Sequence, residues 1–412
     1  MADVHGWTAP GWEGVRDAFE RNFDKGLEVG AAFSAYHRGQ MVVDLWGGLA
    51  DAFEGRPWEE DTIALVYSTT KGVTATCANL LADEGRLDVD APVAAYWPEF
   101  AAAGKADIPV SYLLSHRAGL AWVDGDMDSD DALAWEPVVR ALEAQAPVWE
   151  PGTRHGYHAT TYGWLVGEVV RRIQGKGFGA SFRDLVGDPL GLEFHVGLPD
   201  SEEPRVARLH AAIPSTEGAS TQASEATADP SEAGQHLENL LVQLFGPDAP
   251  LPKALFAPGN ALADHRLWNS PRLHAAEIPS ANGIGDARSV ARMYAACIGE
   301  AATPDGGRLR LLSPEQLGRA TEQHTEGGDL VILDVDLQFG LGYMLNRGVT
   351  ATMGLGSEGG FGHFGLGGSM GWADPDAELA VGYIPNKMEL GLTGDTRSYR
   401  LTKACHAALG AR

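Results

Sequence analysis

The sequence predicts an α+β protein in which an antiparallel sheet, flanked by helices, is formed from both ends of the chain. Three observations lead to this class: β-rich runs near the N-terminus, further β-rich runs near the C-terminus, and mostly helical patterns between them. We therefore expect a discontinuous α/β domain of residues 1–85 and 280–412, and an inserted, mostly helical domain of residues 86–279.

The N-terminal part predicts a helix followed by a β-hairpin. Large apolar residues recur at spacings of three and four over residues 11–25, as on the buried face of an amphipathic helix. Residues 31–37 and 41–46 are β-rich, and the short segment 38–40 between them is typical of a hairpin turn.

A second helix is expected soon after the hairpin. Residues 63–67 lead into Ser68, and residues 71–82 have the pattern of a helix that ends at Gly85. Ser68 is therefore expected where an entering segment turns into a helix.

Helical patterns dominate the middle of the chain, over residues 110–114, 132–144 and 161–173. Residues 214–234 contain no large apolar side chain, so burial cannot offset the entropy of ordering them. We expect this segment to be an exposed, flexible loop.

The C-terminal part returns to strands and closes with a helix. Strand patterns occur at residues 339–345, 368–373 and 378–384, and an amphipathic helix is expected over residues 396–409.

Charge and cysteine use restrict the function. The 412 residues include 56 acidic and 31 basic side chains, and the formal net charge of -25 repels nucleic acid. The three cysteines are isolated, so the sequence encodes neither a disulfide framework nor a cysteine zinc site. We predict no metal and no nucleic-acid partner.

The N-terminus and the apolar runs give a prediction of location. No basic segment followed by an apolar stretch begins the chain, and no apolar run reaches the roughly 18 residues of a membrane span. We expect a cytoplasmic protein without a membrane partner.

Ser68-Thr69-Thr70-Lys71 is the only S-x-x-K segment in the chain. Residues three apart at a helix start face the same way, so the Lys71 amine can reach the Ser68 hydroxyl. A serine is a poor nucleophile until a base takes its proton, and a desolvated lysine can be that base. A serine that merely caps the helix is the alternative that these four residues alone leave open.

Three further segments follow in order: Leu113-Leu-Ser-His-Arg-Ala-Gly-Leu120, Pro151-Gly-Thr-Arg-His-Gly-Tyr157-His158-Ala159, and Gly362-His363-Phe364-Gly365. With the S-x-x-K segment, they resemble the serine β-lactamase and penicillin-binding-protein superfamily. The resemblance is to its class C-like branch, which includes the family VIII carboxylesterases. It covers nearly the whole chain and implies a β-lactamase/transpeptidase-like fold.

The resemblance also implies roles for individual residues. Ser68 is the implied nucleophile, and Lys71 and Tyr157 the implied proton-transfer residues, with Tyr162 as the fallback tyrosine. The implied oxyanion hole pairs the backbone N–H groups of Ser68 and Leu366, with Leu366 on an edge-type strand. A phenol needs a neighbouring cation to act near neutral pH, and we expect Lys71 to be that cation. No cofactor is implied.

A competing motif lies at Gly367-Gly368-Ser369-Met370-Gly371, which matches the G-x-S-x-G nucleophile elbow of α/β-hydrolases. That elbow requires a helix after the serine and a downstream histidine. Here a turn and a β-rich run follow, and the only later histidine is His406. We therefore interpret Ser369 as structural.

The substrate-side residues depart from the family pattern. Ala159 stands where the second motif normally has Asn, and His363, mostly neutral at pH 7, stands where a permanent cation is common. Gly365 and Trp122 are expected to line the substrate site, and Asn282 to offer it a hydrogen bond. These departures weaken recognition of penicillins and D-Ala-D-Ala peptides and favour a small-molecule ester.

We therefore expect a carboxylesterase that cleaves short-chain or small uncharged esters through an acyl-enzyme on Ser68. One alternative keeps the site and changes the substrate: a β-lactamase, a D-aminopeptidase or another amide hydrolase. The other is a non-catalytic, penicillin-recognising binding module, which would misplace the Ser68–Lys71 pair.

Overall fold

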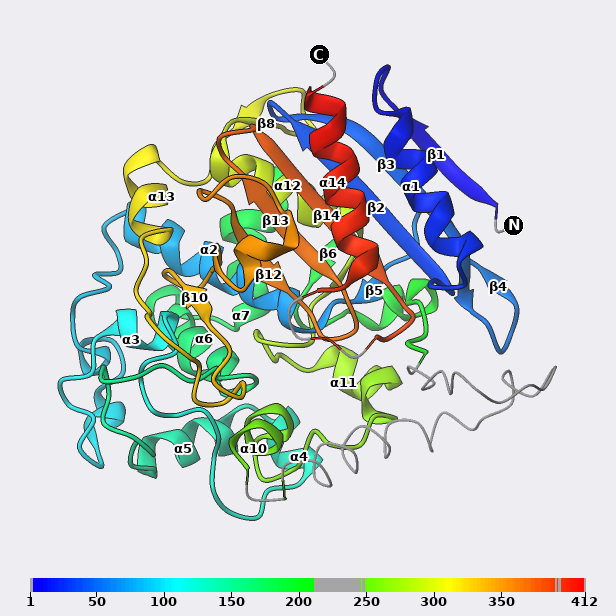
Figure 1. Ribbon diagram of the computed structural model, residues 1–412. Coiled ribbons are helices and arrows are strands. Elements are labelled where there is room, and N and C mark those ends of the chain that lie inside the picture. The colour runs from blue at the N-terminus through cyan, green and yellow to red at the C-terminus, as the bar shows by residue number, and fades with distance from the viewer. Residues whose placement is uncertain (1–2, 211–245, 247–248, 390, 392–393, 411–412) are drawn as a thin grey trace.

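A nine-stranded sheet forms the centre of the computed structural model, which describes residues 3–210, 246, 249–389, 391 and 394–410 (Figure 1). Its strands are β1 (Val4–Thr8), β2 (Gly30–His37), β3 (Gln40–Asp51), β4 (Arg56–Pro57), β10 (Leu337–Phe339), β11 (Met344–Gly348), β12 (Phe361–Phe364), β13 (Met370–Asp374) and β14 (Leu379–Pro385). The order is β1-β3-β2-β14-β13-β12-β11-β10, with β4 beside β3, and every pairing is antiparallel.

The two ends of the chain meet inside this sheet. β14 pairs with β2 along its whole length, with Phe33 opposite Tyr383 and Ala35 opposite Val381. The predicted α+β class, with a sheet built from both chain ends, is confirmed.

Helices cover both faces of the sheet. α1 (Glu13–Asp24) and α14 (Thr396–Gly410) lie against one face, and α12 (Ala287–Ile298) packs against β2, β13 and β14 (Figure 1). Because side chains alternate along a strand, Val381 joins the apolar cluster of α1 and α14 while Ala380 joins that of α12. A Cβ on Gly382 would meet the Ala287 carbonyl, so glycine allows α12 to lie close to the sheet.

Helices of the middle segment gather beside α2 (Thr70–Asp83), whose residues 70–79 are all buried. α2 packs against α6, α13 and β12. The other α-helices among the described residues are α3 (Val110–Leu114), α4 (Ser129–Leu133), α5 (Glu136–Ala144), α6 (Thr161–Gln174), α7 (Phe178–Phe182), α8 (Asp188–Leu190), α10 (Pro250–Phe256), α11 (Pro271–Ala275) and α13 (Pro314–Ala320). No helix among the described residues is long and apolar enough to cross a membrane.

Two small sheets complete the described part of the fold. β5 (Ala64–Leu65) and β6 (Phe194–His195) both pair with β7 (Ile284–Gly285), and β8 (Ala301–Ala302) pairs with β9 (Arg308–Leu309). β7 lies between the other two strands of its sheet, so it links β6 of the middle segment to β5, the strand that leads into Ser68.

Two predicted elements are divided in the structure. The helix expected over residues 132–144 becomes α4 and α5, because Trp135 has a φ of +64° and a new helix starts at Glu136, with Pro137 in its first turn. The strand expected over residues 339–345 becomes β10 and β11, joined by a turn in which Gly342 has a φ of +90°. The loop predicted at residues 214–234 lies outside the described residues.

Candidate active site

Ser68 lies in a single 3-10 turn, η1 (Tyr67–Thr69), that runs directly into α2. Tyr67 has a φ of +44°, in the left-handed region that non-glycine residues rarely adopt. Such a conformation persists where neighbouring contacts fix the backbone, and here Thr70 Oγ1 donates a hydrogen bond of 2.5 Å to the Tyr67 carbonyl. The strained turn presents Ser68 at the start of the helix, where the sequence places it.

Lys71 is fully buried, and its Nζ atom lies 3.0 Å from Ser68 Oγ. Nζ also donates to the carbonyl oxygens of Ala159 at 2.5 Å and Ser280 at 2.9 Å. Among the described residues, no carboxylate forms an ion pair with this amine. Burial therefore lowers the pKa of Lys71 well below its usual value, which favours the neutral amine.

Tyr157 precedes α6 and is 2% exposed. The centre of its ring lies 4.8 Å from Lys71 Nζ, and its phenol forms a hydrogen bond with Ser68. Burial raises the pKa of Tyr157 above its usual value, and the hydrogen bond only partly opposes this. Burial thus favours the neutral form of both groups, and the expectation that a cationic Lys71 assists this phenol stays a prediction.

The fallback tyrosine, Tyr162, is a core residue on α6. Its ring centre is 6.0 Å from Lys71 Nζ, and its ring packs against His116. Its hydroxyl is buried without a hydrogen-bond partner in the described part of the chain. Tyr157 is therefore the tyrosine that contacts Ser68.

Leu366 lies in the turn that joins β12 to β13. The expected edge-type strand is wrong, because β12 is paired on one side with β11 and on the other with β13. A Cβ on Gly365 would collide with the Val66 carbonyl and with Ser369 Oγ. Gly365 therefore lets the turn pack against the segment that carries Ser68.

Ser369 takes part in the same packing. Its hydroxyl donates to the Val66 carbonyl at 2.6 Å and lies 2.9 Å from Thr69 Oγ1. The side chain is buried and joins the β12–β13 turn to η1. This geometry agrees with the interpretation of Ser369 as structural.

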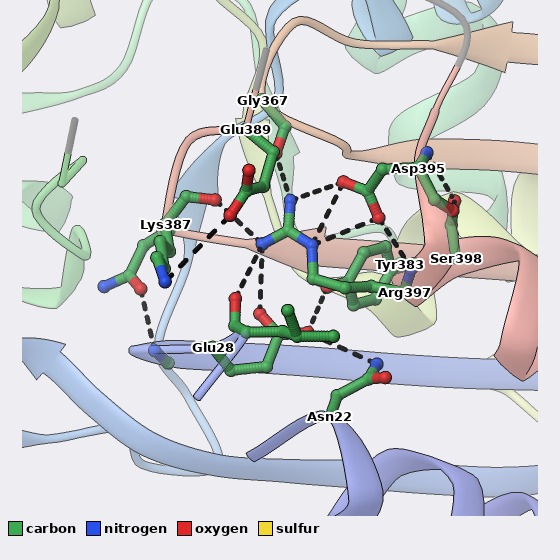
Figure 2. Close-up of polar contacts among 12 residues, drawn as sticks. Asn22, Glu28, Gly367, Tyr383, Lys387, Glu389, Asp395, Arg397 and Ser398 are labelled. Atoms are coloured by element: carbon green, nitrogen blue, oxygen red, sulfur yellow. Dashed lines mark hydrogen bonds and ion pairs between the residues drawn. The ribbon is translucent and has the colours of Figure 1, made fainter. Parts of the chain in front are cut away.

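Arg397, on α14, supports the turn from the other side (Figure 2). Its Nη2 donates to the Gly367 carbonyl at 2.6 Å, and its Nε and Nη2 bind the carboxylate of Asp395. Nη1 reaches Glu28 Oε2 at 3.2 Å, while the Tyr383 hydroxyl donates to Glu28 Oε1. Burial raises the pKa of Glu28 to about 7, although the positive charge of Arg397 opposes this shift.

His363, on β12, is buried beside Tyr157, with 6.1 Å between the ring centres. Its Nδ1 lies 2.7 Å from the Phe364 carbonyl, which places the proton on Nδ1 and leaves Nε2 as an acceptor. Within the described residues Nε2 has no partner. Burial and the nearby Lys71 lower the pKa of His363 to about 3, so the ring is neutral at pH 7.

Asn282 does not fit the predicted substrate-side role. Its Oδ1 accepts from the Ile278 N–H at 2.8 Å, and its Nδ2 donates to the carbonyls of Leu273 and Ala276 at 2.9 and 2.6 Å. The side chain is fully buried. All its hydrogen-bonding groups therefore hold the loop before β7, and none is left for a substrate.

Trp122 is half-buried and packs against the apolar cluster that contains Tyr157 and Ala159. The Lys253 ammonium lies 5.9 Å from the centre of its ring. Trp149 packs on the same cluster. These two indoles place apolar surface next to the candidate catalytic residues.

Sequence reasoning missed the groups that position Lys71 and Tyr157. The main-chain carbonyls of Ala159 and Ser280 could not be predicted to bind Lys71, because every residue has such a carbonyl. Asp329 had a weak signal, a carboxylate directly before the apolar run of residues 330–333. It is fully buried, and its Oδ1 accepts the Tyr157 N–H at 3.1 Å. No group of three His, Cys, Asp or Glu side chains among the described residues is arranged to hold a metal.

The fold and this contact between Ser68 and the buried Lys71 define the class of S-x-x-K proteins. The family model for Beta-lactamase matches residues 19–405, and the chain belongs to this family. The esterase/beta-lactamase LipL of Mycobacterium tuberculosis (strain ATCC 25618 / H37Rv) is 35% identical over 388 residues, which cover 93% of this chain and 83% of LipL.

Two solved structures agree over almost the whole chain. A family VIII carboxylesterase is 38% identical, with a TM-score of 0.82, and the match covers 98% of this chain and 100% of that one. A penicillin-binding protein homologue from Caulobacter crescentus is 36% identical, with a TM-score of 0.82 and the same coverage of 98% and 100%.

Proposed function

We propose that this chain is a serine hydrolase that cleaves small, uncharged carboxylic esters through an acyl-enzyme on Ser68. The observation that carries the proposal is the surroundings of Lys71. A neutral amine has two N–H donors and one lone pair. The carbonyls of Ala159 and Ser280 take the two donors, which leaves the lone pair for the Ser68 hydroxyl 3.0 Å away. A general base needs such a free lone pair within hydrogen-bond distance of the proton that it takes.

The reaction then runs in two displacements. Lys71 takes the proton of Ser68 as Oγ attacks the ester carbonyl carbon, and the N–H groups of Ser68 and Leu366 stabilise the oxyanion. Tyr157 gives its phenolic proton to the leaving alkoxide and regains one from Lys71. Water attacks the acyl carbon, and its proton returns through Tyr157 and Lys71 to Ser68, so that the acid is released and the enzyme restored.

His363 supports a neutral substrate. Its Nε2 is a lone pair buried beside Tyr157, and a lone pair repels the carboxylate that a lysine or arginine would bind. The net charge of -25 also disfavours anionic substrates. The esterase names of LipL and of the family VIII carboxylesterase support the same choice. β-Lactam or amide hydrolysis on this site is the alternative.

A labelling experiment tests the proposal. The protein is incubated with a fluorophosphonate and the adduct is mapped by mass spectrometry, and rates are measured with p-nitrophenyl butyrate, nitrocefin and a D-amino-acid amide. We expect an adduct on Ser68, fastest turnover of the ester, loss of turnover in Ser68→Ala and appreciable turnover in Ser369→Ala. An adduct on Ser369, or faster turnover of nitrocefin or the amide, contradicts the proposal.

The pH dependence should reflect Lys71. Burial lowers its pKa, so the amine is a base above that folded-state pKa and an inactive ammonium below it. Burial also lowers the pKa of His158 to about 4 and that of His363 to about 3, so neither ring titrates near neutrality. We expect kcat/KM for p-nitrophenyl butyrate to fall as the pH is lowered through the depressed pKa of Lys71. A kcat/KM that rises as the pH falls contradicts the assignment of Lys71 as base.

A further inference from the structure

His116 belongs to the segment of residues 113–120 that the proposed reaction leaves without a role. It follows α3, is fully buried, and has a φ of +60°. A left-handed conformation at a residue other than glycine carries a conformational cost, and such positions concentrate at functional sites. The ring of His116 lies 5.0 Å from that of Tyr157, centre to centre.

His116 accepts a hydrogen bond on each side of Tyr157. Its carbonyl accepts the Gly156 N–H at 3.0 Å, and its Nδ1 accepts the His158 N–H at 3.1 Å. The N–H of Tyr157 itself points to Asp329 Oδ1. Three consecutive backbone N–H groups are thus bound, two of them by one residue.

The tautomer of His116 follows from these contacts. Because Nδ1 accepts an N–H, the ring proton is on Nε2, which has no hydrogen-bond partner in the described part of the chain. Burial, together with the neighbouring His158 and Lys71, lowers the pKa of His116 well below its usual value. Burial thus favours the neutral ring, in which Nδ1 is an acceptor.

We propose that His116 is a positioning residue that holds the Tyr157 phenol where it can protonate the leaving alkoxide. The inference rests on the proposed function. A displacement of about 1 Å in a proton-transfer group can lower the rate by about 100-fold. The His116 side chain binds the backbone directly after Tyr157, so its removal can change that distance while the contact of its carbonyl with Gly156 is kept.

The matched pair His116→Asn and His116→Gly tests this role. Both residues tolerate a positive φ, and both remove most of the ring, but only asparagine keeps an acceptor at the position of Nδ1. The substrates are ethyl butyrate, whose leaving ethoxide needs a proton, and p-nitrophenyl butyrate, whose weakly basic nitrophenolate leaves without one. Circular dichroism and thermal unfolding establish that each variant is folded.

We expect His116→Gly to lower kcat/KM, which reports acylation, by about 100-fold for ethyl butyrate and by less for p-nitrophenyl butyrate. His116→Asn should recover at least about tenfold of that loss. Equal losses of kcat/KM on both esters in a folded variant, or an asparagine variant no better than the glycine variant, overturn the inference. If His116→Gly does not fold, His116→Gln replaces it in the comparison. The amide of glutamine lies one bond further from the backbone than that of asparagine, so it is displaced from the position of Nδ1.

The wild type separates this outcome from a failure of the proposed function. If wild type does not hydrolyse either ester, or if Ser68→Ala remains active, the proposed function is wrong. If wild type is active, Ser68→Ala is inactive and His116→Gly keeps full activity on ethyl butyrate, only the role of His116 is wrong.

Discussion

Replacing Lys71 by methionine is expected to lower kcat for ester hydrolysis by about 10⁴-fold or more, with the protein still folded. Methionine fills much of the space of the lysine stem but cannot accept the proton of Ser68. The carbonyls of Ala159 and Ser280 lose their donors, so we also expect a loss of about 1–3 kcal/mol in the free energy of unfolding. Turnover of p-nitrophenyl butyrate and urea unfolding measure the two effects.

Lys105 provides a matched control for this variant. It is also buried, and its Nζ donates to the carbonyls of Ala102, Glu143 and Gln145 at 2.8, 2.9 and 2.6 Å. Lys105→Met should therefore destabilise the protein by a similar amount and leave kcat within about threefold of wild type. Equal losses of kcat in the two variants would show that the effect is structural and would contradict the base role of Lys71.

Replacing Arg397 by methionine is expected to lower the free energy of unfolding by about 3–5 kcal/mol. Arg397 is 1% exposed, and its removal leaves the carboxylates of Glu28 and Asp395 without their buried cation. The Gly367 carbonyl also loses its donor. Chemical denaturation, monitored by tryptophan fluorescence, measures the change.

The same variant should affect the oxyanion side of the site. Gly367 follows Leu366 in the β12–β13 turn, so a loosened turn moves the proposed donor N–H. We expect slower fluorophosphonate labelling of Ser68 in whatever fraction of Arg397→Met is folded. Lys403→Met, an exposed change on the same helix, should alter the stability by less than about 0.5 kcal/mol. An Arg397→Met protein as stable as Lys403→Met would contradict a stabilising role for the cluster in Figure 2.

Local patterns predicted the parts of the fold that local sequence determines. The hairpin of β2 and β3 and the helix α2 lie within a few residues of their expected bounds, because alternation and helical spacing report the buried face of each element. The helix expected over residues 132–144 is divided at Trp135, which has a left-handed φ. Local patterns could not predict this division, because such a φ at a tryptophan depends on its tertiary packing. β12 is a central strand because β11 and β13 pair with it on both sides, and the residue pattern of a four-residue strand does not indicate how many of its edges are paired.

The candidate site divides in a similar way. The S-x-x-K spacing predicted the Ser68–Lys71 contact, because three residues on a helix start leave little freedom of placement. The sequence also shows that Ala159 has no side-chain amide, but not that its carbonyl binds Lys71. For Asn282, polarity beside a glycine predicted a substrate contact, whereas the amide holds its own loop. The catalytic roles themselves stay predictions.

The pairing of β2 with β14 also has a consequence for synthesis of the chain on the ribosome. β2 is complete long before residues 379–385 are made, so its inner edge has no partner while most of the protein emerges. An unpaired apolar edge readily pairs with other chains. The β12–β13 turn is also synthesised late. The ribosome therefore adds Ser68 hundreds of residues before Leu366, whose N–H is the proposed second donor of the oxyanion hole. Translation order thus keeps the site incomplete until the sheet closes.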